Sequence, residues 1–385
     1  MSDLHLHIVA FDIPYPPTYG GVIDIFYQIK ALSEVGMMIH LHAFEYDKGQ
    51  RSEMLEKLCY CIHYYPRKTG FISSIGLKPY ITASRRSKLL IKELIKDNYP
   101  ILFEGLHTCY YINDNRLKER LKLFRATNIE HQYYAYLAFS VRNIFQKIYF
   151  INAAFKLLFY QSVIRNTDII LPVSKSDTEY FQKKFPSKKV ITMPCFHANI
   201  RKQHEKVRGE YVLFQGNLEV AENERAAIYL MCKVMNDIDF PFIIAGNKPS
   251  KRLFNIAKRY PNVSVVASPG EAKMTELINR AHIHLLLTYQ STGLKLKLLN
   301  ALYSGSFVIA NNKILHGTGL ESLCYVGNTS DELKRQVQLL IKTDYHEVKK
   351  NRNVNVLFEN YDIARNAAIL KTLIDEESSE KIVPY

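Results

Sequence analysis

Residues 291–305, STGLKLKLLNALYSG, contain lysines where a phosphorylated ligand could bind. The stretch follows an apolar run at residues 283–289, and its leucines repeat with a helical period. The start of such a helix offers unpaired backbone N–H groups and the positive end of the helix dipole, both of which attract anions. Lys295 or Lys297 would add a positive charge there. We therefore predict a phosphate site at the beginning of this helix.

Residues 16–22, PPTYGGV, form the second candidate ligand-binding segment. Gly20 and Gly21 lie in the predicted loop between the first strand and the first helix, where they would let the backbone approach a ligand closely. A tight turn explains the same pair equally well. The glycine spacing is not G-x-G-x-x-G, although Glu45 and Asp47 end the second strand where a ribose-binding acid belongs. A dinucleotide-dependent dehydrogenase is therefore not predicted.

Two groups of titratable residues could take part in acid/base or metal chemistry. Glu130 and His131 are adjacent, so they could form an acid/base pair near an acceptor or brace other catalytic residues. His5, His7, His40 and His42 alternate along two apolar runs and could share one face of a sheet. No carboxylate or cysteine is evident beside these histidines to complete a metal site. We predict no metal.

Alternating strands and helices would position these residues. In the first half, strands are predicted at residues 4–11, 38–44, 101–105, 121–127 and 168–174, with a helix at 22–35. In the second half, strands are predicted at residues 211–217, 240–246, 263–268, 283–289 and 307–312. Capping boxes at residues 176–179 and 329–332 predict two further helix starts. The aromatic run at residues 142–165 is interpreted as a core or interdomain helix, with membrane or acceptor contact as the alternative.

Residues 293–305 must be a crossover helix, because they connect two consecutive buried strands. Its 3.6-residue period directs four side chains toward the sheet: Leu294, Leu298, Ala301 and Leu302. A polar stripe lies apart from them and consists of Gly293, Lys297, Asn300 and Ser304. Gly305 is suited to a C-terminal cap. Since the sheet already covers the leucines, the helix is not predicted to lie on a membrane.

The whole chain has the length and composition of a folded protein with two domains. It has 385 residues, 47% of them apolar and 23% charged. Its six cysteines include no C-x-x-C pair, and neither a signal peptide nor an 18-residue apolar run is present, so we expect a cytoplasmic protein with free thiols. The domains are predicted at 1–195 and 208–355, followed by a C-terminal helical segment at 356–385.

The net charge of +14 favours anionic partners. Residues 67–96 contain eight lysines and arginines against one acid, Glu93. This stretch is either a solvated helix face or a patch that contacts an anionic membrane. No helix-turn-helix, zinc-knuckle or RNP-like pattern is present, so nucleic acid is not a predicted partner.

Several segments together resemble one enzyme family. The segments are PPTYGG, LFEGLH, TNIEHQYY, LPVSKSD, FQGN followed by Glu222 and Asn223, and STGLKLKLLNALYSGSFVIANN. They resemble the GT-B glycosyltransferases, specifically the retaining family-four type, over nearly the whole chain. The resemblance implies an α/β protein of two Rossmann-like, doubly wound domains that face each other across a cleft.

The resemblance also implies a donor site for a nucleotide diphosphate sugar, with neither a metal nor another cofactor. The residues implied to hold the diphosphate are Gly21, Gly293, Leu294, Lys295 and Lys297. His107 would contact the donor sugar, and Asn300 would reach the ribose. Gly20, Gly216 and Thr292 complete the predicted donor-binding set. His107, Lys297, Glu130 and His131 are the catalytic candidates.

Several positions depart from the family pattern, among them residues 215–223, QGNLEVAEN, which lack the arginine and lysine that many members carry there. The family carries two glutamates eight residues apart where this chain has Thr292 and Asn300, and Thr127 replaces a histidine. Asparagine can still bind a ribose hydroxyl, but without the strength that a carboxylate gives. The expected activity is metal-independent transfer of a hexose to a glycan or lipid-linked glycan acceptor, by a cytoplasmic protein that could touch the inner membrane face. A weakly active or inactive GT-B partner protein and a GT-B sugar-nucleotide epimerase are the alternatives.

Overall fold

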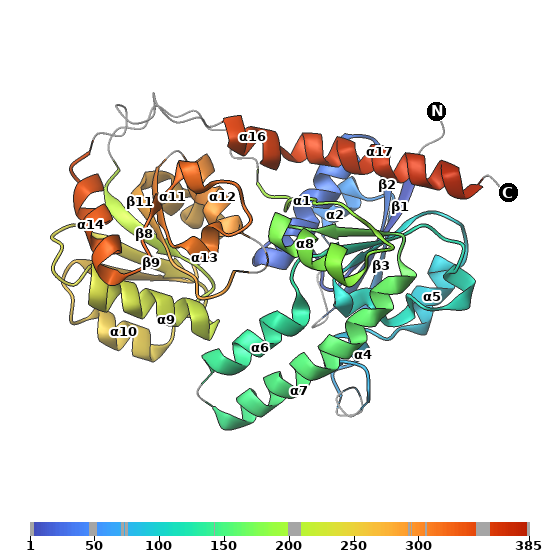
Figure 1. Cartoon of the computed structure of the whole chain (residues 1–385), viewed down its shortest axis with the longest axis horizontal. Coiled ribbons are helices and arrows are strands. Elements are labelled where there is room, and N and C mark those ends of the chain that lie inside the picture. The colour runs from blue at the N-terminus through green and yellow to red at the C-terminus, as the bar shows by residue number, and fades with distance from the viewer. Residues whose placement is uncertain are drawn as a thin grey trace. The chain divides into compact units, whose positions relative to one another are not determined.

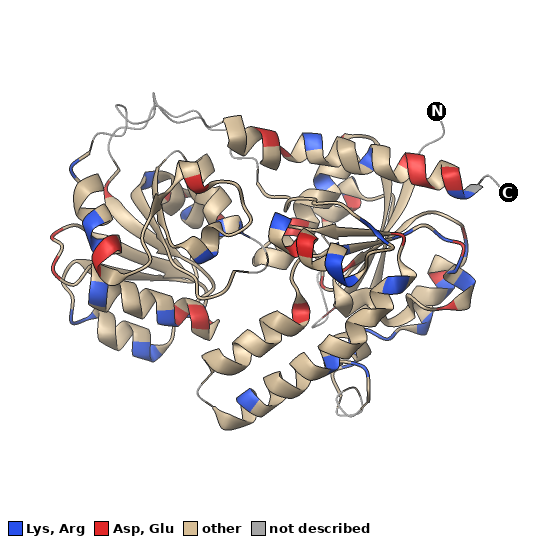
Figure 2. Ribbon diagram, viewed as in Figure 1, with Lys and Arg blue, Asp and Glu red and all other residues tan. Residues whose placement is uncertain are grey.

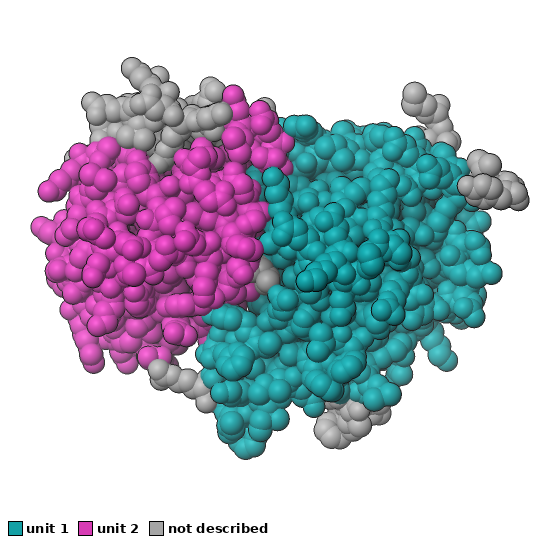
Figure 3. Space-filling view, viewed as in Figure 1, with its two compact units in different colours: residues 1–197, 292–294, 361–385 teal, residues 198–291, 295–360 magenta. Residues whose placement is uncertain are grey.

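A computed structural model describes residues 4–45, 52–70, 73, 76–141, 143–198, 209–291, 293, 295–304, 306–343 and 355–382. The chain forms two compact units (Figure 3). Unit 1 comprises residues 1–197, 292–294 and 361–385, and unit 2 comprises residues 198–291 and 295–360. The sequence predicts boundaries between residues 195 and 208 and at residue 356, whereas unit 2 extends to residue 360 and residues 292–294 group with unit 1. The predicted linker lies partly at 199–208, outside the described residues.

Unit 1 contains a parallel 7-stranded sheet in the order β3-β2-β1-β4-β5-β6-β7. Figure 1 labels its strands β1, β2 and β3. The strands are β1 (Leu4–Ala10), β2 (Met37–Glu45), β3 (Cys61–Pro66), β4 (Ile101–Glu104), β5 (Lys122–Ala126), β6 (Ile169–Pro172) and β7 (Lys189–Val190). The central strands are buried on both faces, which explains why they read as continuous apolar runs. The five predicted strands of this half are confirmed, whereas β3 and β7 were not predicted.

In unit 1, the helices α6 (Glu130–Ser140) and α7 (Ile144–Tyr160) form a long hairpin. The unit also contains α1 (Gly20–Glu34), α2 (Glu53–Leu58), α4 (Tyr80–Ala83), α5 (Lys88–Leu94), α8 (Lys175–Lys184) and α17 (Ile363–Ile382). Helix α8 is capped by Ser174, whose hydroxyl accepts from the Asp177 N–H, so the predicted start at Ser176 is two residues late. The three-residue spacing from Ser174 to Asp177 places a backbone N–H over the hydroxyl, which Ser176 cannot do once it is inside the helix.

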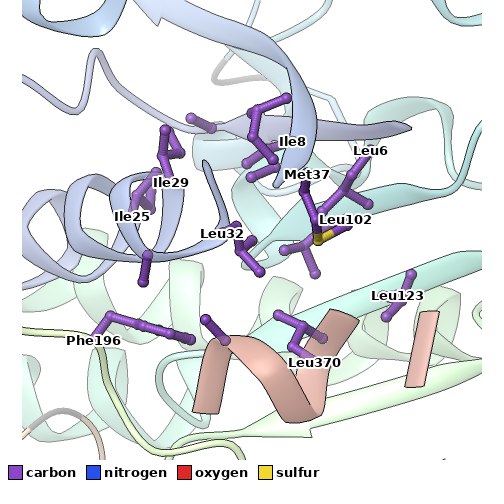
Figure 4. Close-up of a cluster of buried hydrophobic side chains, with 14 of the residues drawn as sticks. Leu6, Ile8, Ile25, Ile29, Leu32, Met37, Leu102, Leu123, Phe196 and Leu370 are labelled. Atoms are coloured by element: carbon purple, nitrogen blue, oxygen red, sulfur yellow. The ribbon is translucent and has the colours of Figure 1, made fainter. Parts of the chain in front are cut away.

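The C-terminal helix α17 completes the core of unit 1. Ala367, Leu370 and Ile374 repeat at helical spacing and are fully buried. They belong to one cluster with apolar side chains of α1 and of strands β1, β2, β4 and β5. Figure 4 shows Leu370 among the side chains of this cluster. The Lys371 amine also donates to the Val35 carbonyl at 2.6 Å, which ties α17 to the end of α1.

Unit 2 contains a parallel 6-stranded sheet in the order β10-β9-β8-β11-β12-β13. Its strands are β8 (Tyr211–Gln215), β9 (Phe242–Gly246), β10 (Val263–Ala267), β11 (Ala281–Leu286), β12 (Phe307–Ala310) and β13 (Tyr325–Val326). Its helices are α9 (Ala221–Tyr229), α10 (Lys251–Ala257), α11 (Glu271–Arg280), α12 (Leu296–Tyr303), α13 (Asn312–Leu315), α14 (Ser330–Leu340) and most of α16 (Asn355–Tyr361). The capping box of Thr329 and Glu332 is confirmed at α14.

Of the two alternatives that the sequence predicts for residues 142–165, a core helix and an interdomain helix, the core helix is wrong. Helix α7 and a following 3₁₀ segment occupy this stretch, but Leu157 is the one fully buried side chain of α7. The other large apolar residues of α7 are mostly exposed. Within the part of the chain that the structure describes, no helix combines the length and the apolarity of a membrane-spanning segment.

Candidate functional site

Lys297 lies in the first turn of α12, at the carboxyl edge of the unit 2 sheet. The helix follows β11, and ligands bind at this edge in open α/β sheets. The Lys297 amine lies 3.3 Å from the Leu287 carbonyl oxygen and 5.8 Å from the centre of the Phe214 ring. Burial lowers its pKa to about 8, although the nearby Glu222 carboxylate acts in the opposite direction. The amine is therefore mostly protonated at neutral pH, and a bound anion would strengthen that charge.

Glu222 is a buried carboxylate beside this lysine. It lies in the first turn of α9, and one of its oxygens accepts from the Thr288 hydroxyl at 2.6 Å and from the Tyr289 N–H at 2.7 Å. These bonds connect α9 to the segment after β11. The guanidinium of Arg225, on the same helix, lies 4.5 Å from the Tyr289 ring centre. The sequence points to Glu222 only as part of a motif, so its position beside Lys297 is new information.

The start of α12 differs from the prediction. The helix begins at Leu296, because Gly293 has a φ of +80° and Lys295 has φ and ψ of −105° and 33°, neither of which is helical. The Lys295 side chain is buried, and its amine donates to the Ser291 carbonyl at 2.8 Å. Thr292, Leu294 and the predicted cap Gly305 lie outside the described residues.

The face of α12 that contacts the sheet is also shifted. Leu298 and Ala301 are buried as predicted, but Leu302 is only partly buried, and Leu296 and Leu299 are buried in its place. Leu296 and Leu299 are three positions apart and therefore share one side of the helix, which is buried as well. Lys297, Asn300 and Ser304 remain partly exposed, on the side away from these leucines.

Gly216 ends the first strand of unit 2 in a tightly packed turn. A Cβ atom at Gly216 would lie 3.2 Å from the side chain of Asn223, and one at Gly246 would lie 1.7 Å from the Gly216 carbonyl oxygen. The Asn223 amide in turn donates to the Asn217 carbonyl at 2.9 Å. The close approach of the two strand ends therefore requires Gly246, and Asn223 fixes the turn that follows β8.

In unit 1, the glycine pair belongs to the first helix. Gly20 and Gly21 are the first residues of α1, whereas the sequence predicts them in the preceding loop. A Cβ atom at Gly21 would lie 2.5 Å from the ring of Phe11, so this position needs glycine for internal packing. Before them, the Tyr19 hydroxyl donates to Asp12 at 2.6 Å. The turn and the helix start are therefore held by contacts within unit 1.

His107 and Glu130 face each other at the carboxyl end of β4. The chain turns at Gly105, whose φ is +68°, and enters the 3₁₀ helix Leu106–Tyr111. The Nδ1 atom of His107 lies 3.9 Å from a carboxyl oxygen of Glu130. Burial raises the pKa of Glu130 to about 8 and holds the pKa of His107 well below its usual value. Near pH 7 a neutral imidazole thus lies beside a mostly protonated carboxyl group that can release its proton under mildly basic conditions.

Arg85 is a buried cation beside this pair. Its guanidinium donates to the carbonyls of Phe11 at 2.7 Å and of Ile81 at 2.6 Å, and the Phe11 ring lies 5.0 Å from that of His107. Its charge contributes to the low pKa of His107 and opposes the rise of the Glu130 pKa. The sequence assigns Arg85 to an exposed basic stretch, which is wrong because two backbone carbonyls hold its charge inside the unit.

His131 does not join this group. Its ring lies 6.0 Å from that of Tyr180 on α8, and burial together with the charge of Lys184 lowers its pKa. Adjacent residues of a helix point about 100° apart. The structure therefore brings Glu130 to His107 and directs His131 toward α8, so the two neighbours in sequence do not act on one another.

The predicted histidine cluster exists and is larger than expected. His5 and His40 are joined through ring nitrogens at 2.9 Å, and His7 and His42 at 2.8 Å. Asp97 contacts His7 at 3.0 Å. Cys61 and His63 of the unpredicted strand β3 extend the cluster, so the expectation that neither a carboxylate nor a cysteine lies beside these histidines is wrong. Among the described residues, no group has a geometry suited to holding a metal ion.

A buried ion pair lies beneath the start of α1. Arg125 of β5 donates to both carboxylate oxygens of Asp24 at 3.1 and 3.2 Å, and both residues are fully buried. Arg125 also donates to the carbonyls of Met193 and Pro194, and Asp24 accepts from the Phe196 N–H at 2.6 Å. The pair therefore joins α1, β5 and the segment that follows β7. The sequence offers no signal for it, because the two residues are 101 positions apart.

Comparison with known proteins defines the fold. No protein-family model matches the sequence. An uncharacterized 44.6 kDa protein in the cps region of Klebsiella pneumoniae is 26% identical over 332 residues, covering 81% of this chain and 84% of that protein. The glycosyltransferase WaaG, involved in lipopolysaccharide biosynthesis, has a TM-score of 0.64 at 10% identity, over 95% of this chain and 99% of its own. The chain has the GT-B fold.

Two further solved structures support this assignment. The GT-B chain resembles Anabaena HepE in complex with UDP and glucose, with a TM-score of 0.61 at 11% identity over 98% of this chain and 99% of HepE. It also resembles OtsA, with a TM-score of 0.63 at 10% identity over 99% and 100% of the two chains. The two Rossmann-like sheets predicted from the sequence are thus confirmed.

Proposed function

We propose that this GT-B protein is a retaining glycosyltransferase. It would move a hexose from a nucleotide diphosphate sugar to a glycan or a lipid-linked glycan. The observation that carries the proposal is the position of Lys297, a partly desolvated amine in the first turn of α12 at the carboxyl edge of a parallel sheet. The first N–H groups of a helix have no partner inside it, so they add to the attraction for a diphosphate.

In this proposal, protein charges take the place that a metal has in other transferases. Lys297 and the start of α12 stabilise the negative charge that develops on the leaving diphosphate. Lys295 and Gly293 shape the segment that precedes the helix, and Asn300 contacts the ribose. The charge of the nearby Glu222 carboxylate raises the pKa of the Lys297 amine and so favours its protonated form.

The residues of unit 1 act on the sugar. His107 is neutral and contacts the transferred hexose, while the ionised fraction of Glu130 takes the proton that the acceptor hydroxyl releases. The acceptor attacks from the face that the diphosphate leaves, so the anomeric configuration is retained. His131 has no part in this step, because it lies toward Tyr180.

The acceptor is proposed to belong to polysaccharide biosynthesis at the cytoplasmic face of a membrane. Two observations support this. WaaG is described as involved in lipopolysaccharide biosynthesis, and HepE binds UDP and glucose. In addition, residues 67–96 of unit 1 are strongly basic, and Lys68, Arg86, Lys88 and Lys92 are exposed there. Exposed lysine and arginine attract anionic lipid headgroups.

A thermal-shift screen against UDP-, GDP-, ADP- and dTDP-sugars tests the donor site. A ligand at 100 times its Kd adds about 2.7 kcal/mol to the free energy of unfolding. Lys297→Ala should abolish the shift, whereas Lys258→Ala, an exposed lysine of the same unit, should leave it unchanged. A shift that survives Lys297→Ala would show that the diphosphate binds elsewhere.

A catalytically silent GT-B protein is the second candidate, and Asn300 favours it. Asparagine stands where the family has a ribose-binding glutamate, and an amide binds a hydroxyl less strongly than a carboxylate does. Such a protein would show the thermal shift without releasing nucleotide from any donor. Release of nucleotide diphosphate only when an acceptor is added would establish the transferase, and release of free sugar without an acceptor would establish an epimerase.

A further inference from the structure

Helix α7 carries an unusually large set of exposed apolar side chains. Phe145 is 79% exposed, Phe155 is 63% exposed and Phe159 is 62% exposed. The other exposed apolar residues of the helix are Ile144, Ile148, Tyr149, Ile151 and Leu158. Single exposed apolar residues are common, but a contiguous group of this size marks a surface that contacts another apolar phase.

These side chains form one stripe along the helix. Ile144, Ile148, Ile151, Phe155 and Leu158 follow the spacing 4, 3, 4, 3, which keeps them on one face at 100° per residue. Leu157 points to the opposite side and is buried in the core of unit 1. The helix is therefore anchored by one face and presents the other to its surroundings.

Basic residues border the stripe, and acids are absent from it. On the helical projection, Lys147 and Lys156 fall on opposite sides of the apolar face. Residues 131–167 contain neither aspartate nor glutamate. Figure 2 shows α7 with blue segments and no red ones. Lysines at the borders of an apolar face can extend their amines toward anionic headgroups while their methylenes stay in the apolar layer.

A cavity of about 850 Å³ opens beside this stripe. It is lined by Leu77, Ile148, Ile151, Phe155 and Phe159, with Lys78 and Lys156 among the polar groups. The Lys156 amine donates to the Gly76 carbonyl at 2.8 Å and the Lys78 amine lies 3.7 Å from the Tyr110 ring centre, so both lysines are held at the cavity. An apolar hollow with fixed amines matches a lipid that has an acyl or prenyl chain and an anionic head.

We propose that α7 and residues 76–78 form a docking surface for a bilayer that contains anionic lipids. The helix lies in the interfacial layer with its apolar stripe among the acyl chains and its lysines at the headgroups. It lies there rather than crossing, because its 17 residues span about 25 Å and include two lysines. This inference rests on the proposed function, since the bilayer would present the lipid-linked acceptor to unit 1.

Sedimentation with vesicles tests the surface. The full chain is mixed at low salt with vesicles of phosphatidylglycerol and phosphatidylcholine, and with vesicles of phosphatidylcholine alone. We expect binding to the anionic vesicles, and at least tenfold weaker binding both to the neutral ones and in the double variant Phe155→Gln/Phe159→Gln. The matched control is Leu339→Gln/Ile369→Gln, which removes two exposed apolar side chains from α14 and α17 and should bind like the unmodified chain.

Three results would overturn the proposal. The first is failure of the unmodified chain to bind anionic vesicles, and the second is equal binding by the α7 variant. The third is a dimer of the unmodified chain in sedimentation velocity that is absent in the α7 variant, because a second copy of the chain would then cover the apolar stripe. The donor thermal shift is measured on the same variants. Vesicle binding without any donor shift would refute the glycosyltransferase alone, and a donor shift without vesicle binding would refute the docking surface alone.

Discussion

Replacing Arg125 with methionine should destabilise unit 1 strongly. The substitution keeps a similar volume but removes the charge and every hydrogen bond of the guanidinium, two to Asp24 and two to backbone carbonyls. Asp24 would keep the Phe196 N–H as a donor but would remain a fully buried carboxylate without a counter-charge. Breaking a buried ion pair in this way costs about 3–5 kcal/mol.

Circular dichroism on heating measures the effect. In a domain of about 200 residues, each kcal/mol lowers the melting temperature by roughly 2–4 °C, so a fall of roughly 6–20 °C is expected. Because two units rarely unfold in one step, hydrogen exchange with mass spectrometry should show the loss in β1, β4 and β5. The matched control is Arg116→Met, which removes a surface pair with Asp114 and should leave the melting temperature nearly unchanged.

A double variant decides whether the charge is the cause. Asp24→Asn keeps an acceptor for the Phe196 N–H while removing the uncompensated charge. If the reasoning is right, Asp24→Asn/Arg125→Met is more stable than Arg125→Met alone, since the pair no longer leaves one ion buried without the other. Equal melting temperatures for Arg125→Met and Arg116→Met, or a double variant less stable than Arg125→Met, would refute it.

Three other changes test the buried groups of unit 1. Burial lowers the pKa of His40 to about 4, so the folded state resists protonation of this residue. The free energy of unfolding should therefore fall as pH drops from 6.5 toward 4, by about 2–3 kcal/mol at pH 4.5. Urea unfolding of the unmodified chain and of His40→Gln measures whether the variant has the smaller pH dependence. Burial raises the pKa of Glu104 to about 8, so the folded state keeps the carboxyl group protonated and loses stability as pH rises from 4.5 to 8. Glu104→Gln should therefore be about 1–3 kcal/mol more stable than the unmodified chain at pH 8. An equal gain in stability at pH 5 would contradict this explanation. Leu370→Ala should cost about 2–5 kcal/mol in urea unfolding, whereas Ile369→Ala, exposed on the same helix, should stay within about 0.5 kcal/mol.

The arrangement of strands was predictable because burial on both faces leaves a clear mark in the sequence. Strands β1, β4 and β11 are mostly apolar and mostly buried, and the connections between parallel strands have one favoured hand. Strand β3 escaped prediction because it lies at the sheet edge, where Cys61, Ile62, His63 and Tyr64 are only partly buried. Strands β7 and β13 have two residues each, too few for any period.

The candidate site was predictable where it depends on position along a βα unit, and unpredictable where it depends on distant partners. Lys297 follows from its place after β11. The pairing of Glu130 with His107 could not be predicted, because it depends on the turn at Gly105. Arg85 could not be distinguished from a surface arginine in the sequence, because the two carbonyl groups that bind it come from the folded structure. An amphipathic pattern such as that of α7 is also ambiguous, since it does not say which face finds a partner.

The return of α17 to unit 1 has a consequence for the order in which the protein matures. Leu370 and Ile374 fill the same core as the first strand, yet they are made after all of unit 2. During synthesis, unit 2 can bury its own core while unit 1 still exposes the apolar groove that α17 will occupy. A nascent chain therefore carries an unfinished unit 1 until α17 has been made, and a truncation that removes α17 would expose the core around β1.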